Sequence, residues 1–249
     1  MSRIIVSDSG DVRRVTVAHE AKLNCLNSAL LEQLAQAFAV DEGIRAVVLT
    51  GEGTRAFIGG ADIREMGAIA DPSGARAFIT RVHQACAAIR ACPVPVIARV
   101  QGWCLGAGME IAAACDLRIA AGAAHFGMPE VRVGIPSVVE AALLPGLIGW
   151  GRTRRLLLLG ETIDAATAEA WGFCERVVPL DALDAAVEEW VGMLREAGPR
   201  AIANQKALIR AWEELSLSEA VAAGIPAFAS AFETDEPTRM MGAFLGRRR

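Results

Sequence analysis

Short apolar runs that alternate with glycine loops and helix-like segments constrain the fold of this chain most strongly. RAVVLTG at residues 45–51, PVPVIARVQG at 93–102 and LRIAA at 117–121 are dense in small or β-branched apolar residues, as buried strands are. Helix-like spacing separates them, at residues 73–91 and in MEIAAACD at 109–116. Strands that alternate with helices predict an α/β fold. The strands are short and loops interrupt them often, which is unlike a doubly wound sheet.

The two ends of the chain differ from this middle part. Residues 3–6 and 12–17 flank a glycine turn and predict a hairpin, and a helix is expected to begin near Asn27. From about residue 195 onward the pattern is helical only. We therefore divide the chain into a core at residues 1–194 and a helical C-terminal portion at residues 195–249.

The charge argues against nucleic acid and membrane partners. The formal net charge is −4 and the isoelectric point is about 5.5, which gives no general attraction to nucleic acid. The arginines at residues 247–249 are expected to be a solvated tail. We find no signal-peptide pattern and no uninterrupted run of eighteen apolar residues. These features predict a cytoplasmic protein.

Cysteine, histidine and hydrophobic content add three expectations. The six cysteines form no CxxC pair and are expected to be reduced. The three histidines are far apart in the sequence, so no metal site is expected. The chain is 53% hydrophobic with a mean hydropathy of +0.34, which favours surface hidden between subunits of an oligomer.

Two acids stand in an apolar stretch, GWCLGAGMEIAAACDLRIAAGAAHFGMPE, at residues 102–130. Glu110 lies among alanines and other apolar residues, and Glu130 follows a proline twenty residues later. Burial disfavours the charged form of a carboxyl and raises its pKa unless a partner compensates. Such acids either form buried ion pairs or take part in proton transfer.

Two glycine loops could supply free backbone N–H groups. GGAD at residues 59–62 follows a predicted strand, and Gly102, Gly106 and Gly108 precede the alanine-rich helix. N–H groups from both loops could form an oxyanion hole for a carbonyl oxygen. An ordinary strand-to-helix turn is the alternative for the first loop. The second does not meet the GxGxxG fingerprint, which argues against a dinucleotide-dependent oxidoreductase.

Six segments carry a resemblance that covers nearly the whole chain. They are LNCLNSALLEQL, AVVLTGEGTRAFIGGADIREM, PVPVIARVQGWCLGAGMEIAAACDLRIAA, FGMPEVRVGIP, GETIDAATAEAWGFCERVVP and FETDEPTRMMGAFLGRR. In this order they resemble the enoyl-CoA hydratase/isomerase family, the crotonase superfamily. The resemblance implies the crotonase fold, a spiral of ββα units with a helical C-terminal trimerisation region. It also implies a homotrimer or a dimer of trimers.

The resemblance assigns roles to four residues. The backbone N–H groups of Ala61 and Ala107 would form the oxyanion hole, although hydratases usually carry glycine at the second position. Glu110 and Glu130 would be the two catalytic acids, and retention of both favours hydration of a trans-2-enoyl-CoA. The coenzyme A thioester is the substrate, and no separate cofactor or metal is implied.

The resemblance also implies a coenzyme A site. Lys22, Leu23 and Leu26 would lie near the adenine, and the segment that contains Gly60, Ala61, Asp62, Ile63 and Arg64 would line the pantetheine region. Arg64, and Lys206 from a neighbouring subunit, would reach phosphates; the alternative for both is a solvated helix face. Trp103, Cys104 and Leu105 would shape the acyl pocket, with core packing as the alternative.

The segment after GIP departs from the family pattern. It reads SVVEAALLPGLIGWGRTRRL and is bulkier than the usual glycine-rich sequence. Glu140 within it would be a helix-start acid or the partner of Arg152, Arg154 or Arg155. The sharper hypothesis is contact with a polar substrate group or a part in proton transfer. The departure keeps an enoyl-CoA isomerase, or a dehydratase of a functionalised acyl-CoA, open as alternatives. A non-catalytic RNA- or acyl-CoA-binding homologue is the alternative from another class.

Overall fold

The computed structural model describes residues 2–246, so the basic tail expected at residues 247–249 lies outside the described residues. A six-stranded sheet has the order β1-β2-β3-β5-β7-β10. β1 and β2 form the predicted antiparallel hairpin, and the remaining pairs are parallel. The strands are β1 (Arg3–Ser9), β2 (Val12–Ala18), β3 (Ala46–Gly51), β5 (Val96–Val100), β7 (Leu117–Ala121) and β10 (Arg176–Val178).

A smaller sheet stands beside the first, with the order β4-β6-β8-β9. Its strands are β4 (Ala56–Ile58), β6 (Trp103–Leu105), β8 (His125–Gly127) and β9 (Thr162–Asp164). β4, β6 and β8 are parallel, and β9 is antiparallel to β8. β3, β5 and β7 are each followed by one of these short strands and then by helical turns, so the chain winds as a spiral of ββα units.

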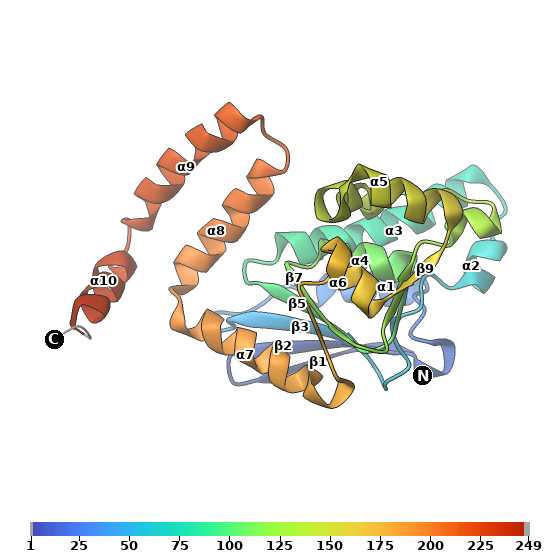
Figure 1. The fold of residues 1–249 in the computed structure, drawn as a ribbon, viewed down its shortest axis with the longest axis horizontal. Coiled ribbons are helices and arrows are strands. Elements are labelled where there is room, and N and C mark those ends of the chain that lie inside the picture. The colour runs from blue at the N-terminus through green and yellow to red at the C-terminus, as the bar shows by residue number, and fades with distance from the viewer. Residues whose placement is uncertain (1, 247–249) are drawn as a thin grey trace.

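Helices cover both faces of the large sheet (Figure 1). Alternate residues of a strand point to opposite faces. On β3, Val47 and Leu49 therefore join the main core, whereas Ala46 and Val48 pack with α7. The helices up to α7 are α1 (Ser28–Gln36), α2 (Ile63–Gly67), α3 (Pro72–Ala91), α4 (Ala107–Ala114), α5 (Leu144–Leu159), α6 (Ala165–Trp171) and α7 (Leu183–Glu196), with 3-10 turns η1 (Glu20–Lys22), η2 (Glu130–Val133), η3 (Val139–Leu143) and η4 (Leu180–Ala182).

The last three helices extend away from the sheets (Figure 1). They are α8 (Pro199–Trp212), α9 (Leu217–Ala231) and α10 (Glu236–Gly246), and they form the helical end expected from about residue 195. α9 begins with a capping box, in which Ser216 and Glu219 satisfy each other's backbone N–H groups. Large apolar side chains remain exposed along α9 and α10, Leu217, Val221, Ile225, Phe228, Met241 and Leu245 among them.

Two segments were predicted as loop or turn and are partly strand. The chain at FIGGADI contains the end of β4, and the glycine turn after residue 102 contains β6. Each strand has three residues, which is too short for the alternating pattern by which a strand is recognised from sequence. These short strands carry the two glycine loops to the site.

Candidate active site

The loop after β4 is held in place by the chain that precedes α1. The Leu26 N–H donates to Gly60 O at 2.9 Å, and the Asp62 N–H donates to Leu26 O at 2.7 Å. Leu26 is fully buried, so it supports this loop from within the core and does not offer its side chain to a ligand, contrary to our expectation. Between these two bonds, the Ala61 N–H has no acceptor among residues 2–246.

The second free amide lies at the start of α4. Gly106 caps the helix with φ 52° and ψ −122°, and Ala107 is the first helical residue. The N–H groups in the first turn of a helix have no partner within the helix and carry partial positive charge. Since Ala107 has helical backbone angles, its Cβ is tolerated where hydratases usually carry glycine. Ala61 and Ala107 both line one pocket.

Glu110 lies one turn further along α4 and also lines this pocket. Only 4% of its surface is exposed. Burial, followed by the negative charges of Glu130 and Glu140, raises the pKa of Glu110 to about 8, while the backbone at Ala141 and Val138 acts in the opposite direction. Glu110 is therefore largely protonated at neutral pH.

Glu130 begins the 3-10 turn η2, next to the glycine that caps α4. It is half-buried, lines the pocket, and accepts a hydrogen bond at 2.8 Å from Ser137 Oγ to its Oε2. Its other oxygen, Oε1, lies so close to Gly106 that a Cβ there would be 2.4 Å away. Ser137 was not among the residues expected at the site, and it is the first residue of the segment that departs from the family pattern.

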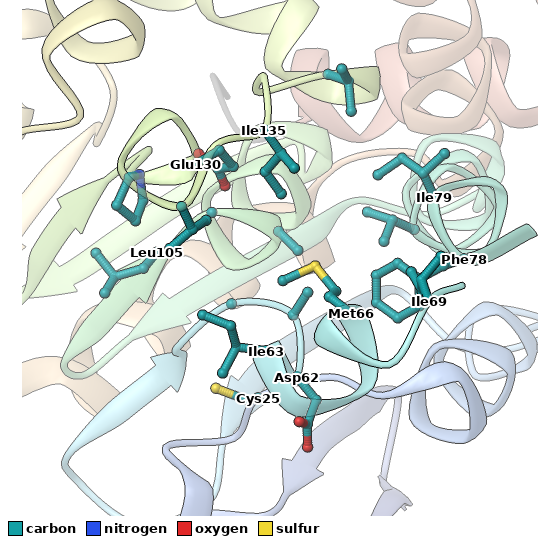
Figure 2. A pocket seen from close by; sticks show the side chains of 18 of the residues that line it. Cys25, Asp62, Ile63, Met66, Ile69, Phe78, Ile79, Leu105, Glu130 and Ile135 are labelled. Carbon is teal, nitrogen blue, oxygen red and sulfur yellow. The ribbon is translucent and has the colours of Figure 1, made fainter. Parts of the chain in front are cut away.

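The pocket has a volume of about 990 Å³ and is mostly apolar (Figure 2). Figure 2 shows Glu130 and Leu105 on one side, and Phe78, Ile69 and Ile79 on the other. The apolar lining comes from the stretch that runs from α2 into α3 and from the end of η2 with the chain that leads to η3: Met66, Ile69, Phe78, Ile79, Val82, Val133, Ile135 and Val138. The sequence does not identify Met66, Ile69 or the lining residues of α3, because helix spacing alone does not say which apolar residue faces a cavity.

Several residues expected at the coenzyme A site do line the pocket. They are Lys22, Gly60, Asp62, Ile63 and Arg64. Lys22 Nζ lies 2.7 Å from Asp62 Oδ2, and this ion pair lowers the pKa of Asp62. Asp62 also caps α2. The pocket edge therefore carries the cations Lys22 and Arg64, of which Lys22 is already paired with Asp62.

Four other expectations differ from the structure. Lys206 is 7% exposed and donates to Asp116 Oδ2 at 2.6 Å and Val94 O at 3.0 Å, which uses its charge inside the chain. Trp103 stacks at a tilt over His125 outside the pocket, and Cys104 is buried in the core. Leu23 does not line the pocket either; its carbonyl accepts from Gly59 N–H.

One of the two structural alternatives for Glu140 is confirmed. It lies in the first turn of η3, as a helix-start acid does, and its hydrogen-bond partner is His83 on α3, at 2.8 Å, rather than one of the three arginines. Arg152 donates to Trp171 O, and Arg155 pairs with Glu161. The pairing was missed because His83 and Glu140 are far apart in the sequence.

Two free amides and two acids at one apolar pocket define a site that can hold a carbonyl oxygen as charge develops on it and move protons beside it. Comparison with known proteins agrees with this chemistry. A family profile described as enoyl-CoA hydratase/isomerase matches residues 8–249. The chain belongs to the enoyl-CoA hydratase/isomerase family.

Individual relatives match along almost their whole lengths. A probable enoyl-CoA hydratase of Mycobacterium bovis is 34% identical over 249 residues, which span 98% of this chain and 95% of the relative. A 2,3-dehydroadipyl-CoA hydratase of Escherichia coli is 34% identical, spanning 100% and 97%. The crystal structure of an enoyl-CoA hydratase of Mycobacterium smegmatis matches with a TM-score of 0.94 at 31% identity, spanning 99% and 97%. These matches confirm the crotonase fold.

Proposed function

We propose that the protein is an enoyl-CoA hydratase, which reversibly adds water to a trans-2-enoyl-CoA. The observation that carries the proposal is the meeting of Glu110, Glu130 and the free amides of Ala61 and Ala107 at one pocket. The water oxygen bonds to the β-carbon, one carboxylate takes a proton from that water, and a carboxyl group donates a proton to the α-carbon. The enolate oxygen rests on the two amides between these steps. An oxyanion-hole donor contributes about 10² to 10³-fold to the rate.

The apolar lining next to Glu130 favours a second candidate on the same scaffold. Val133, Ile135 and Val138 line the pocket in and beside the segment that departs from the family pattern, so they change the shape of the space for the acyl group. The second candidate reaction is therefore dehydration or isomerisation of a functionalised acyl-CoA. The two relatives described above carry names for different hydratase substrates at equal identity. Chromatography of the products from 3-hydroxyacyl-CoA and 3-enoyl-CoA separates these reactions from hydration.

The coenzyme A moiety is assigned to the pocket edge formed by Lys22 and Arg64. Cations at this edge suit phosphate groups, Arg64 through its fork of N–H donors and Lys22 as a point charge. Arg64→Ala is expected to raise KM for the thioester several-fold and leave kcat nearly unchanged. An unchanged KM would remove Arg64 from the site.

The C-terminal helices are proposed as the oligomerisation region of residues 195–249, beside a catalytic core of residues 1–194. The exposed apolar side chains of α9 and α10 form a surface of the kind that marks an interaction site. The family resemblance suggests a second copy of the chain as the partner. We expect a homotrimer or a dimer of trimers, measured by analytical ultracentrifugation; a monomer at micromolar concentration would contradict it.

We also propose a cytoplasmic location. All six cysteines are free thiols, as in proteins of reducing compartments. Within residues 2–246, no helix combines the length and the apolar character needed to cross a membrane. Export of the protein into an oxidising compartment would contradict this assignment.

The direct test of the function is hydration of crotonyl-CoA, followed by loss of the enoyl-thioester absorbance. Glu110→Gln and Glu130→Gln are each expected to lower kcat by at least about 10²-fold, because each removes general acid–base catalysis. Glu32→Gln is the matched control, since Glu32 pairs with Arg81 on the outside of α3. Hydration at near wild-type rate in either active-site variant would overturn the proposal.

A further inference from the structure

Glu140 has an unusual environment for a carboxyl group that does not line the pocket. It is 7% exposed, on the turn η3 that packs against α3, α4 and α5. The His83 ring donates to its Oε1 at 2.8 Å, and its Oε2 is buried with no hydrogen-bond partner among residues 2–246. A buried polar atom without a hydrogen-bond partner destabilises the fold, so its presence here suggests a functional role for Glu140.

The charged groups around Glu140 offer little compensation for a negative charge. From α5, the cations are used elsewhere: Arg152 on Trp171 O, Arg155 on Glu161, and Arg154 over the ring of Trp150. α4 contributes Glu110, and η2 contributes Glu130 and Arg132, whose guanidinium donates to Leu159 O at 3.4 Å. From α3 come the Cys86 thiol and His83, whose ring reaches solvent.

The buried Cys86 thiol is close enough to both Glu140 and Glu110 to be affected by the charge of each. Burial, followed by the charges of Glu140 and then Glu110, raises the pKa of this thiol well above its usual range. The charge of Glu140 also contributes to the raised pKa of Glu110, after burial and the charge of Glu130. Glu140 does not line the pocket, and the turn η3 that carries it packs against α4, the helix that carries Glu110.

We propose that Glu140, held by His83, is a positioning residue for proton transfer, whose buried negative charge keeps the proton of the catalytic pair on Glu110. Glu110 then donates its proton to the α-carbon, and ionised Glu130 takes a proton from the water whose oxygen bonds to the β-carbon. After one turnover Glu130 holds the proton taken from the water, and this proton must return to Glu110 before the next turnover. One water is consumed, and both carboxyl groups end in their starting states. This inference rests on the proposed function.

The pH dependence of hydration tests the inference with two variants that separate charge from shape. Glu140→Gln keeps the size of the side chain and an acceptor for His83 but removes the charge. The alkaline limit of kcat/KM should then move to lower pH by about 1 unit, because a nearby negative charge that favoured protonated Glu110 is gone. Glu140→Asp keeps the charge and should stay closer to the wild type. Glu32→Gln, which removes a carboxylate on α1 that is 57% exposed and pairs with Arg81, should not move the limit.

A measurement without substrate separates this inference from the proposed function. In protein with ¹³C-labelled glutamate carboxyls, the Glu110 resonance is identified by its loss in Glu110→Gln and titrated. Its midpoint should fall in Glu140→Gln and be retained in Glu140→Asp. An unchanged midpoint in Glu140→Gln would overturn the inference even if hydration is observed. A lowered midpoint in a protein without hydratase activity would support the electrostatic coupling and contradict only the proposed function.

Discussion

Gly106 and Glu130 are packed so closely that no side chain fits between them. A Cβ on Gly106 would lie 2.4 Å from Glu130 Oε1. Gly106 also has φ 52° and is followed directly by Ala107, whose amide we assign to the oxyanion hole. One glycine thus fixes the start of α4 and leaves room for the Glu130 carboxylate.

Gly106→Ala is therefore expected to impair catalysis more than folding. The new methyl group would push the Glu130 carboxylate aside and strain the backbone that presents the Ala107 amide. We expect kcat to fall by at least about 10-fold, since misplaced acid–base groups lose much of their effect. Gly10→Ala is the control, because Gly10 has φ 62° in the β1–β2 turn with nothing within 4 Å of its Cβ position. Equal activity of both variants would contradict the role of Gly106.

Ser137→Ala is expected to lower kcat by about 10-fold or more with a small change in KM. The hydroxyl donates to Glu130 Oε2, and a hydrogen bond to a charged group is worth about 1.5–3 kcal/mol. Steady-state kinetics with one thioester measures the effect. Ser137→Thr, which retains a hydroxyl, should recover part of the loss. A full loss in both variants would point to packing as the cause.

Glu110→Gln is expected to stabilise the fold as the pH rises. A folded-state pKa of about 8 against an ordinary 4.5 means that the unfolded chain releases its proton first. The wild type therefore loses stability from about pH 4.5 up to about pH 8 and no further above it. The free energy of unfolding of the variant relative to wild type should rise by up to about 4 kcal/mol across this window. Urea unfolding at pH 5 and pH 9, at one protein concentration, measures it; a flat difference would show that Glu110 is not perturbed.

Lys206→Met is expected to destabilise the chain and leave substrate binding intact. Removing one partner of a buried ion pair typically costs about 3–5 kcal/mol, and here it would leave Asp116 without its cation beneath α8. Thermal unfolding and KM are measured together. Lys22→Met should raise KM, because Lys22 lies at the pocket edge, and should also lower stability, because it leaves the buried Asp62 without its cation. A raised KM in Lys206→Met alone would restore the phosphate contact expected from sequence.

The sequence predicts the larger elements well because their patterns are long enough to read. β3 and β5 are continuous buried runs, and α3 shows helical spacing over twenty residues. β4, β6 and β8 have three residues each and owe their existence to pairing with one another. No local pattern predicts such strands.

The same distinction applies to the site. Glu110, Glu130 and the two glycine loops stand in motifs, so their meeting at one pocket could be expected. Contacts between distant segments could not: His83 and Glu140 are 57 positions apart, and Lys206 and Asp116 are 90 apart. Tertiary packing alone decides these pairs. It pairs Glu140 with a histidine, where an arginine was one of the alternatives, and it gives Lys206 an internal ion pair in place of the expected ligand contact.

The most direct test of the central claim is the crotonyl-CoA assay on wild type, Glu110→Gln and Glu130→Gln, each verified as folded and of the same oligomeric state. The account predicts loss of the enoyl-thioester absorbance in the wild type and a kcat at least about 10²-fold lower in each variant. Hydration in either variant at a rate close to that of the wild type would contradict it.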